Sequence, residues 1–168
     1  MIDDNQVKST IESFAAELPR FPDGRINYSK SNIAPVITVF VIYDHQVLLL
    51  KRSKKVRTYK QKWNTIAGYL DDPNQSIKEK MLEELNEEVD ITKDTIEQFI
   101  FGKRYQFTDT TAEKTWIVHP TKVILKEKPV IHLDWEHTTF RWIHPKEITR
   151  FDTVPMLKKS LSAVIDTD

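Results

Sequence analysis

Residues 76–89, with the sequence SIKEKMLEELNEEV, predict an amphipathic helix. Ser76 and Glu79 form a capping box, which specifies where the helix begins. Wound at about 100° per residue, the helix gathers its apolar side chains on one arc of about 140°, the core side: Ile77, Met81, Leu82, Leu85 and Val89. Glu88 falls inside this arc and Glu84 just outside it. We therefore expect the Glu88 carboxylate to be partly desolvated, with Glu84 beside it.

These glutamates are poorly placed for a helix that only faces water. Glu84 and Glu88 lie one turn apart, and like charges at that spacing destabilise a helix by about 0.2–0.5 kcal/mol. Carboxylates in the last turn also oppose the helix dipole. Two interpretations remain open on spacing alone. The glutamates form a solvated acidic face, or they supply clustered oxygen ligands for a hard divalent cation such as Mg²⁺.

The sequence around this helix alternates between extended and helical patterns. Residues 36–43 (VITVFVIY) are continuously apolar, which is typical of a strand buried on both faces. Residues 155–165 predict a closing helix with Pro155 in its first turn. Further strands are predicted at residues 46–50, 63–70, 99–107, 115–125 and 138–143. Strands around one acidic helix, with helices at both ends, predict an α/β or α+β sandwich.

The N-terminal segment has a different character. Residues 5–18 place apolar side chains at helical spacing, and Pro19 ends the pattern. We therefore divide the chain into an N-terminal helix with an extended connector, residues 1–32, and one domain over residues 33–168 that includes the C-terminal helix. The pattern leaves open whether the first helix packs on this domain or on a partner.

Composition excludes several classes of protein. Of 168 residues, 39% are hydrophobic and 30% charged, which suits one globular domain. Lys plus Arg and Asp plus Glu both number 25, and zero net charge disfavours a general nucleic-acid binder. The absence of cysteine excludes disulfides and thiolate nucleophiles. The longest apolar run, residues 33–43, is shorter than the about 20 residues that a membrane span needs. With no secretory signal pattern, we expect a cytoplasmic protein.

With the residues before it, the acidic helix resembles the Nudix box, G-x5-E-x7-R-E-U-x-E-E-x-G-U, where U is aliphatic. Five positions match: Glu84, Leu85, Glu87, Glu88 and Ile91. Four positions differ, because the glycines, the first glutamate and the arginine are replaced by Tyr69, Asp90, Gln75 and Glu83. Residues 34–150, including KWNTIAGYL and WIHPKEI, are also similar to Nudix domains. Residues 135–164 resemble an archaeal-type subgroup.

The resemblance implies a mixed β-sheet between helices. It also implies hydrolysis, dependent on Mg²⁺ or Mn²⁺, of a nucleoside diphosphate linked to another group, such as ADP-ribose, a sugar nucleotide or a nucleotide. By position, Glu84 and Glu88 would bind the metal ion. Glu87 would be a further ligand or an orienting group, and the carbonyl of Gly68 would complete the shell.

The resemblance also directs attention to a base that removes a proton from the attacking water. In some family members this base is a glutamate of a late loop, and Glu136 occupies the corresponding place. Glu113 and Glu84 are rival candidates. The alternative for Glu136 is an ordinary loop carboxylate.

A basic run at residues 51–62 places seven cations in twelve residues. It is either a solvated hairpin or a phosphate clamp beside the acidic helix. Arg52 and Arg57 are the better phosphate ligands, because a guanidinium binds phosphate through two hydrogen bonds. Four aromatic residues are candidates to stack on a base, although most aromatics of such a domain belong to the core: Trp63, Tyr69, Trp116 and Phe140.

Glu83 is the departure that matters most for activity, because it puts a negative charge where the family has arginine. An amide of Gln75 and the cation of Lys80 are candidates to compensate. Two functions therefore compete, a metal-dependent pyrophosphohydrolase and a binding or regulatory module with little turnover. A third class, the isopentenyl diphosphate isomerases of this fold, is strongly disfavoured, because their chemistry relies on a cysteine and this chain has none. The expected partner is a small nucleotide-type substrate, and many relatives form homodimers.

Overall fold

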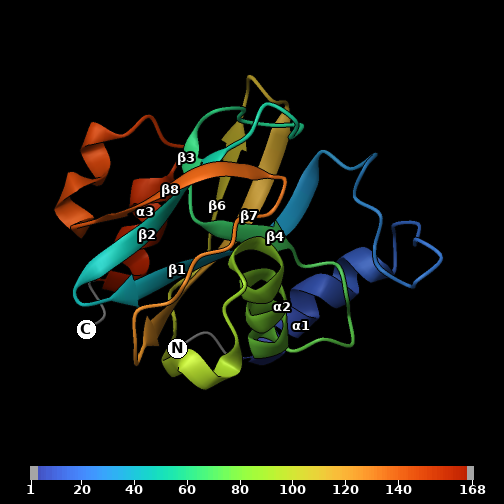
Figure 1. The fold of residues 1–168 in the computed structure, drawn as a ribbon. Coiled ribbons are helices and arrows are strands. Elements are labelled where there is room, and N and C mark those ends of the chain that lie inside the picture. Colours follow the sequence, from blue (N-terminus) through green and yellow to red (C-terminus); the bar gives the residue numbers. More distant parts are fainter. Residues whose placement is uncertain (1–3, 166–168) are drawn as a thin grey trace.

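A mixed β-sheet of eight strands forms the centre of the molecule (Figure 1). The computed structural model describes residues 4–165, so residues 1–3 and 166–168 of the two predicted ranges lie outside the described part. β1 runs parallel to β7, and the other strand pairings among the described residues are antiparallel. The strands are β1 (Ile33–Tyr43), β2 (Gln46–Arg52), β3 (Trp63–Asn64), β4 (Ile66–Tyr69), β5 (Ile96–Phe101), β6 (Tyr105–Asp109), β7 (Lys114–Leu125) and β8 (His137–Ile143).

Helices cover both faces of this sheet (Figure 1). α1 (Asp4–Ala15) and α2 (Ile77–Val89) share one core with β1, in which Ile37 and Val39 are buried. α3 (Leu157–Ile165) covers the opposite face and packs in a second core with Phe40. Because successive residues of a strand point to opposite faces, β1 is buried on both sides, as its apolar sequence predicts. The mixed sheet between helices is confirmed.

Two segments that we predicted as single strands are each divided in two. Segment 63–70 forms β3, which pairs with β2, and β4, which pairs with β1. The hydroxyl of Thr65, between them, donates to a carbonyl of β1 at 2.7 Å. Segment 99–107 forms the second half of β5 and the start of β6, which pair with β7 on either side of Pro120. There the N–H of Gly102 donates to the Pro120 carbonyl at 2.8 Å. Both predictions were wrong. In the first segment the chain changes its partner strand from β2 to β1, and in the second its pairing with β7 is interrupted between Phe101 and Tyr105.

The ends of the helices follow local chemistry. α2 begins with the predicted capping box, in which the Ser76 hydroxyl accepts from the Glu79 N–H at 3.1 Å and the Glu79 carboxylate accepts from the Ser76 N–H at 3.0 Å. α3 begins after Met156, whose φ of 67° lies outside the helical region, and not at the predicted residue 155. α1 is shorter than predicted and ends at Ala15. Two short 3₁₀ helices were not predicted, Lys93–Thr95 and Pro145–Arg150.

The N-terminal helix packs on its own domain. Val7 and Ile11 are buried in the core that α1 shares with α2 and β1. The connector is fixed as well, because the N–H of Ile26 donates to the carbonyl of Asp71 at 2.8 Å and the Tyr28 hydroxyl donates to the Leu70 carbonyl at 2.7 Å. The open question about this helix is thus answered. None of the helices within residues 4–165 has the length and apolar character needed to cross a membrane.

Candidate active site

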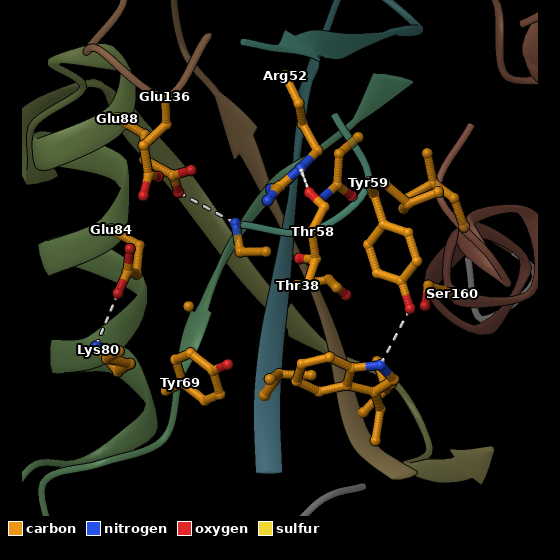
Figure 2. Close-up of a pocket in the computed structure, with 18 of the residues that line it drawn as sticks. Thr38, Arg52, Thr58, Tyr59, Tyr69, Lys80, Glu84, Glu88, Glu136 and Ser160 are labelled. Atoms are coloured by element: carbon orange, nitrogen blue, oxygen red, sulfur yellow. Dashed lines mark hydrogen bonds and ion pairs between the residues drawn. The ribbon is translucent and has the colours of Figure 1, made fainter. Parts of the chain in front are cut away.

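A cavity of about 600 Å³ opens between α2, the sheet and the start of α3. Figure 2 shows Glu84 and Glu88 on α2 and Glu136 on a neighbouring loop, all directed toward the same region, with Arg52 across from them. Six carboxylates line this cavity: Asp71, Glu84, Glu87, Glu88, Asp134 and Glu136. The structure thus brings together Glu84, Glu87, Glu88 and Glu136, which the sequence singled out separately.

The two inner glutamates of α2 are buried with little compensation. Glu88 is 3% exposed, and its carboxylate accepts a hydrogen bond from the N–H of Ala67 at 3.1 Å. Burial, with the nearby charge of Glu84, raises its pKa well above the ordinary value. Burial also raises the pKa of Glu84 to about 7, although the cation of Lys80 at 2.7 Å opposes this. Glu87 is exposed at the rim.

Gly68 lies directly against the Glu84 carboxylate. A Cβ added at this glycine would lie 2.1 Å from Glu84 Oε1, which is far inside van der Waals contact. Gly68 also pairs with Ile37 in the antiparallel ladder between β4 and β1. The absence of a side chain at Gly68 therefore lets the Glu84 carboxylate lie against the backbone of β4.

A histidine that the sequence did not single out, His137, lies directly after the loop that contains Glu136. Oxygen or nitrogen atoms of Glu88, Glu136 and His137 lie within 4.8 Å of one another, an arrangement able to hold a metal ion. Nδ1 of His137 lies 2.8 Å from the carboxylate of Asp134. The sequence Asp134-Trp135-Glu136-His137 contained a usable signal, a histidine directly after the candidate base. Burial, followed by the charge of Asp134, raises the pKa of Glu136.

The two arginines chosen from the sequence have different positions. Arg52 lines the cavity, and its Nε donates to the carbonyl of Thr58 at 3.1 Å. Burial lowers the pKa of its guanidinium, and the charges of Glu136 and Glu88 oppose that change. Arg57 is exposed and does not belong to the described cavity lining. Glu113, a rival for the base, is likewise exposed and absent from that lining.

Glu83, which stands at the position of the family arginine, has three polar partners in the structure. Gln75 donates to its carboxylate at 2.7 Å, and the Lys80 ammonium lies 3.5 Å away, so both compensating contacts expected from the sequence are present. The guanidinium of Arg25, in the connector, forms a further ion pair with Glu83. Partial burial works against ionisation, but Gln75 and the two cations keep the pKa of Glu83 below its ordinary value.

Aromatic side chains form the wall away from the carboxylates. Tyr69 is 42% exposed and stacks on Tyr28, and its ring centroid lies 6.0 Å from that of Trp116. Tyr69 and Trp116 line the cavity, whereas Trp63 packs edge-on against Phe151 in the core under α3. Of the four aromatic candidates, Tyr69 and Trp116 are therefore placed to contact a ligand. Phe140 is partly exposed on β8 and is not part of the described lining.

This combination defines a class of protein, an α/β-sandwich domain whose acidic helix faces a ligand-sized cavity. The sequence matches the family model of the NUDIX domain over residues 33–164. The chain therefore belongs to the Nudix family of pyrophosphohydrolases.

Solved structures share this fold. A MutT protein from Methanosarcina mazei Go1 is 22% identical, with a TM-score of 0.63, over 77% of this chain and 91% of that chain. A NUDIX hydrolase from Nitrosomonas europaea is 18% identical, with a TM-score of 0.62, over 80% of this chain and 95% of the other. A bifunctional NMN adenylyltransferase/ADP ribose pyrophosphatase from Francisella tularensis is 15% identical, with a TM-score of 0.66, over 98% of this chain and 47% of that one. A search of curated proteins gives no match.

Proposed function

We propose that the protein hydrolyses, with a divalent metal ion, the pyrophosphate bond of a nucleoside diphosphate linked to another moiety. The observation that carries this proposal is the convergence of Glu84, Glu88 and Glu136 on one cavity with Arg52. Carboxylates that are buried without enough cations around them favour a bound cation, because burying uncompensated charge is costly. A cytoplasmic location and a nucleotide-type ligand belong to the same proposal.

Each residue has a role in this proposal. Glu84, Glu87, Glu88 and the carbonyl of Gly68 would hold Mg²⁺ or Mn²⁺. Such an ion neutralises phosphate charge and lowers the pKa of a bound water. The carboxylate of Glu136 accepts the proton that water loses as it attacks phosphorus.

The remaining cavity residues bind the substrate. Arg52 binds a phosphate oxygen opposite the carboxylates, where a guanidinium provides paired donors. Tyr69 and Trp116 hold the base or the sugar by stacking. Arg57, exposed outside the cavity, is proposed only as a contact for a substrate that extends beyond it.

The names of similar structures support the substrate class without fixing the substrate. The Francisella tularensis protein is described as an ADP ribose pyrophosphatase, and a Caenorhabditis elegans neighbour, 18% identical with a TM-score of 0.57, as an Ap4A hydrolase. Both names refer to nucleotides with linked phosphates. We therefore propose dinucleoside polyphosphates, ADP-ribose and sugar nucleotides as the panel to test.

One observation favours a weakly active binding or regulatory module instead. The ammonium of Lys80 lies 2.7 Å from Glu84 Oε1, where it competes with a metal ion for that carboxylate. In such a module a nucleotide would bind without turnover.

The decisive experiment measures release of nucleoside monophosphate from this panel with Mg²⁺ or Mn²⁺. We expect turnover for at least one compound, and Glu88→Gln should lower it by about 10²–10³-fold, because one preorganised charge is lost. Glu97→Gln, an exposed carboxylate on β5, is the matched control and should keep full activity. Metal-dependent nucleotide binding without turnover would instead favour the module.

A further inference from the structure

His137 is buried in an unusual way. Its side chain is 0% exposed, and its Nδ1 lies 2.8 Å from the carboxylate of Asp134. Its other ring nitrogen, Nε2, is buried and has no hydrogen-bond partner among residues 4–165. Oε1 of the Glu88 carboxylate lies 3.6 Å from Nε2, which is too far for a hydrogen bond. Buried polar atoms are nearly always paired, so this nitrogen calls for a partner that is not part of the chain.

We propose that Nε2 of His137 ligates the divalent metal ion together with the carboxylates of Glu88 and Glu136. This inference rests on the proposed function and revises its metal site, because His137 joins the donor set and Glu136 acts as a metal ligand instead of as the base that accepts the water proton. Ligand atoms of these three residues lie within 4.8 Å of one another. Ligands of one ion each lie about 2.0–2.2 Å from it, so only small side-chain movements are needed to enclose an ion.

Asp134 prepares the histidine for this role. An ionised carboxylate can only accept a hydrogen bond. Its contact with Nδ1 therefore places the ring proton on Nδ1 and leaves the lone pair of Nε2 free. Histidine ligands of metal ions almost always have such a partner on the second ring nitrogen, which fixes the ring and its tautomer. The orientation of His137 is therefore that of a ligand and not that of an ordinary core histidine.

The backbone holds this loop against the acidic helix. The N–H of Asp134 donates to the carbonyl of Glu88 at 3.2 Å, and the N–H of Ser53 donates to the carbonyl of Glu136 at 2.7 Å. His137 itself is the first residue of β8 and pairs with Arg52 of β2. The three donors thus come from α2 and from a loop anchored at both ends, so they are positioned before any ion binds.

An imidazole in the donor set changes which ion is preferred. Mg²⁺ takes oxygen ligands, whereas imidazole nitrogen suits Zn²⁺ and other first-row transition ions. A set of two carboxylates and one imidazole therefore favours Zn²⁺, Co²⁺ or Mn²⁺ over Mg²⁺. The glutamates of α2 alone would not give this preference.

The test measures metal binding without substrate, by calorimetric titration of the full chain with Mn²⁺, Zn²⁺ or Mg²⁺. His137→Leu should weaken Mn²⁺ and Zn²⁺ binding by about 10–100-fold, with a much smaller effect on Mg²⁺. His119→Leu is the matched control, because His119 of β7 is also fully buried but is not part of the described cavity lining, and binding should be unchanged. Equal metal affinities in the wild type and His137→Leu would overturn the proposal.

A second measurement on the wild-type protein covers a variant that fails to fold. With histidine labelled by nitrogen-15, added Zn²⁺ should shift the Nε2 resonance of His137 strongly and leave that of His119 in place. Metal uptake with an unshifted His137 resonance contradicts this inference and leaves the proposed hydrolysis intact. A shifted resonance without turnover on the nucleotide panel supports the inference and contradicts the hydrolysis. No uptake of any ion contradicts both.

Discussion

Gly68 leaves free the space in which the Glu84 carboxylate lies, because a Cβ at this position would meet the end of the Glu84 side chain. The Glu84 carboxylate occupies the space that a Cβ on residue 68 would need, because such a Cβ would lie 2.1 Å from Glu84 Oε1. Lys80 fixes the same oxygen from the other side at 2.7 Å. A proposed metal ligand is thus held between a bare backbone and a buried cation, and its position depends on both.

Replacing this glycine tests that dependence. In Gly68→Ala the new methyl group displaces the end of the Glu84 side chain, which is flexible, so the fold should survive. Because a misplacement of about 1 Å costs about 10²-fold in rate, we expect a loss of that order in kcat with little change in melting temperature. Activity assays and thermal melts measure the two effects. In a Glu84→Gln background the same substitution should add almost nothing, and full additivity would contradict this explanation.

The sequence contains enough information to predict some of these residues and too little for others. Glu84 and Glu88 are predicted as candidate ligands from helical spacing, and Gly68 is predicted from the resemblance to the Nudix box. His137 does not follow, because its burial beside Glu88 is created by a loop that packs on α2 after 45 intervening residues of unrelated pattern. Arg25 has the same difficulty, since nothing in residues 19–32 indicates an ion pair with the acidic helix.

At the scale of elements, the connector supplies a cation beside the position at which the family has arginine. Arg25 pairs with Glu83, and the adjoining Ile26 N–H donates to the carbonyl of Asp71, in the loop before α2. Lys80 then links Glu83 to Glu84 across one turn of the helix, with ion-pair distances of 3.5 Å and 2.7 Å. The negative charge of Glu83 is thus paired with a cation from another element, Arg25 of the connector.

The ion pair between Arg25 and Glu83 predicts an effect of Arg25 on activity. Arg25→Ala should lower kcat/KM by about 10-fold, because groups that orient a site from behind its ligands have effects of that size. In the double variant Gln75→Glu, Glu83→Arg, which restores the two charged positions of the box, the loss of Arg25 should have little effect. Lys30→Ala, an exposed cation of the same connector, is the control. Equal losses from Arg25→Ala in both backgrounds would mean that the connector acts only on stability.

Element boundaries show where local patterns stop being informative. The capping box predicts the start of α2 to the residue, because both of its hydrogen bonds are local. The division of the other two segments is not local. Segment 63–70 changes its partner strand from β2 to β1, and segment 99–107 interrupts its pairing with β7. The alternation of apolar and polar residues along a strand indicates which face of the sheet each residue occupies. It does not indicate which strand lies next to it.

For the whole molecule, the sheet separates two cores, and a histidine is buried within it. His119 of β7 is 0% exposed and pairs with Ile37 of β1. Neither ring nitrogen has a hydrogen-bond partner within the described residues. Burial, with the charge of Arg104 as a smaller cause, lowers the pKa of His119 to about 4. Its protonation is therefore linked to folding of the entire chain.

The sign of this linkage predicts lower stability in acid. Above a pH of about 6.5, His119 is neutral in both states and contributes no pH dependence. Between about 6.5 and 4 the unfolded chain binds a proton that the folded chain does not, so the free energy of unfolding falls as pH falls, by about 3 kcal/mol at pH 4. Chemical denaturation across this range measures the loss.

His119→Phe should remove that part of the slope, whatever its effect on stability at neutral pH, because a phenyl ring cannot be protonated. Part of the acid loss should persist in His119→Phe, because burial also lowers the pKa of His137. A slope that is unchanged in His119→Phe would mean that the folded chain opens enough near β7 to hydrate this ring before it unfolds.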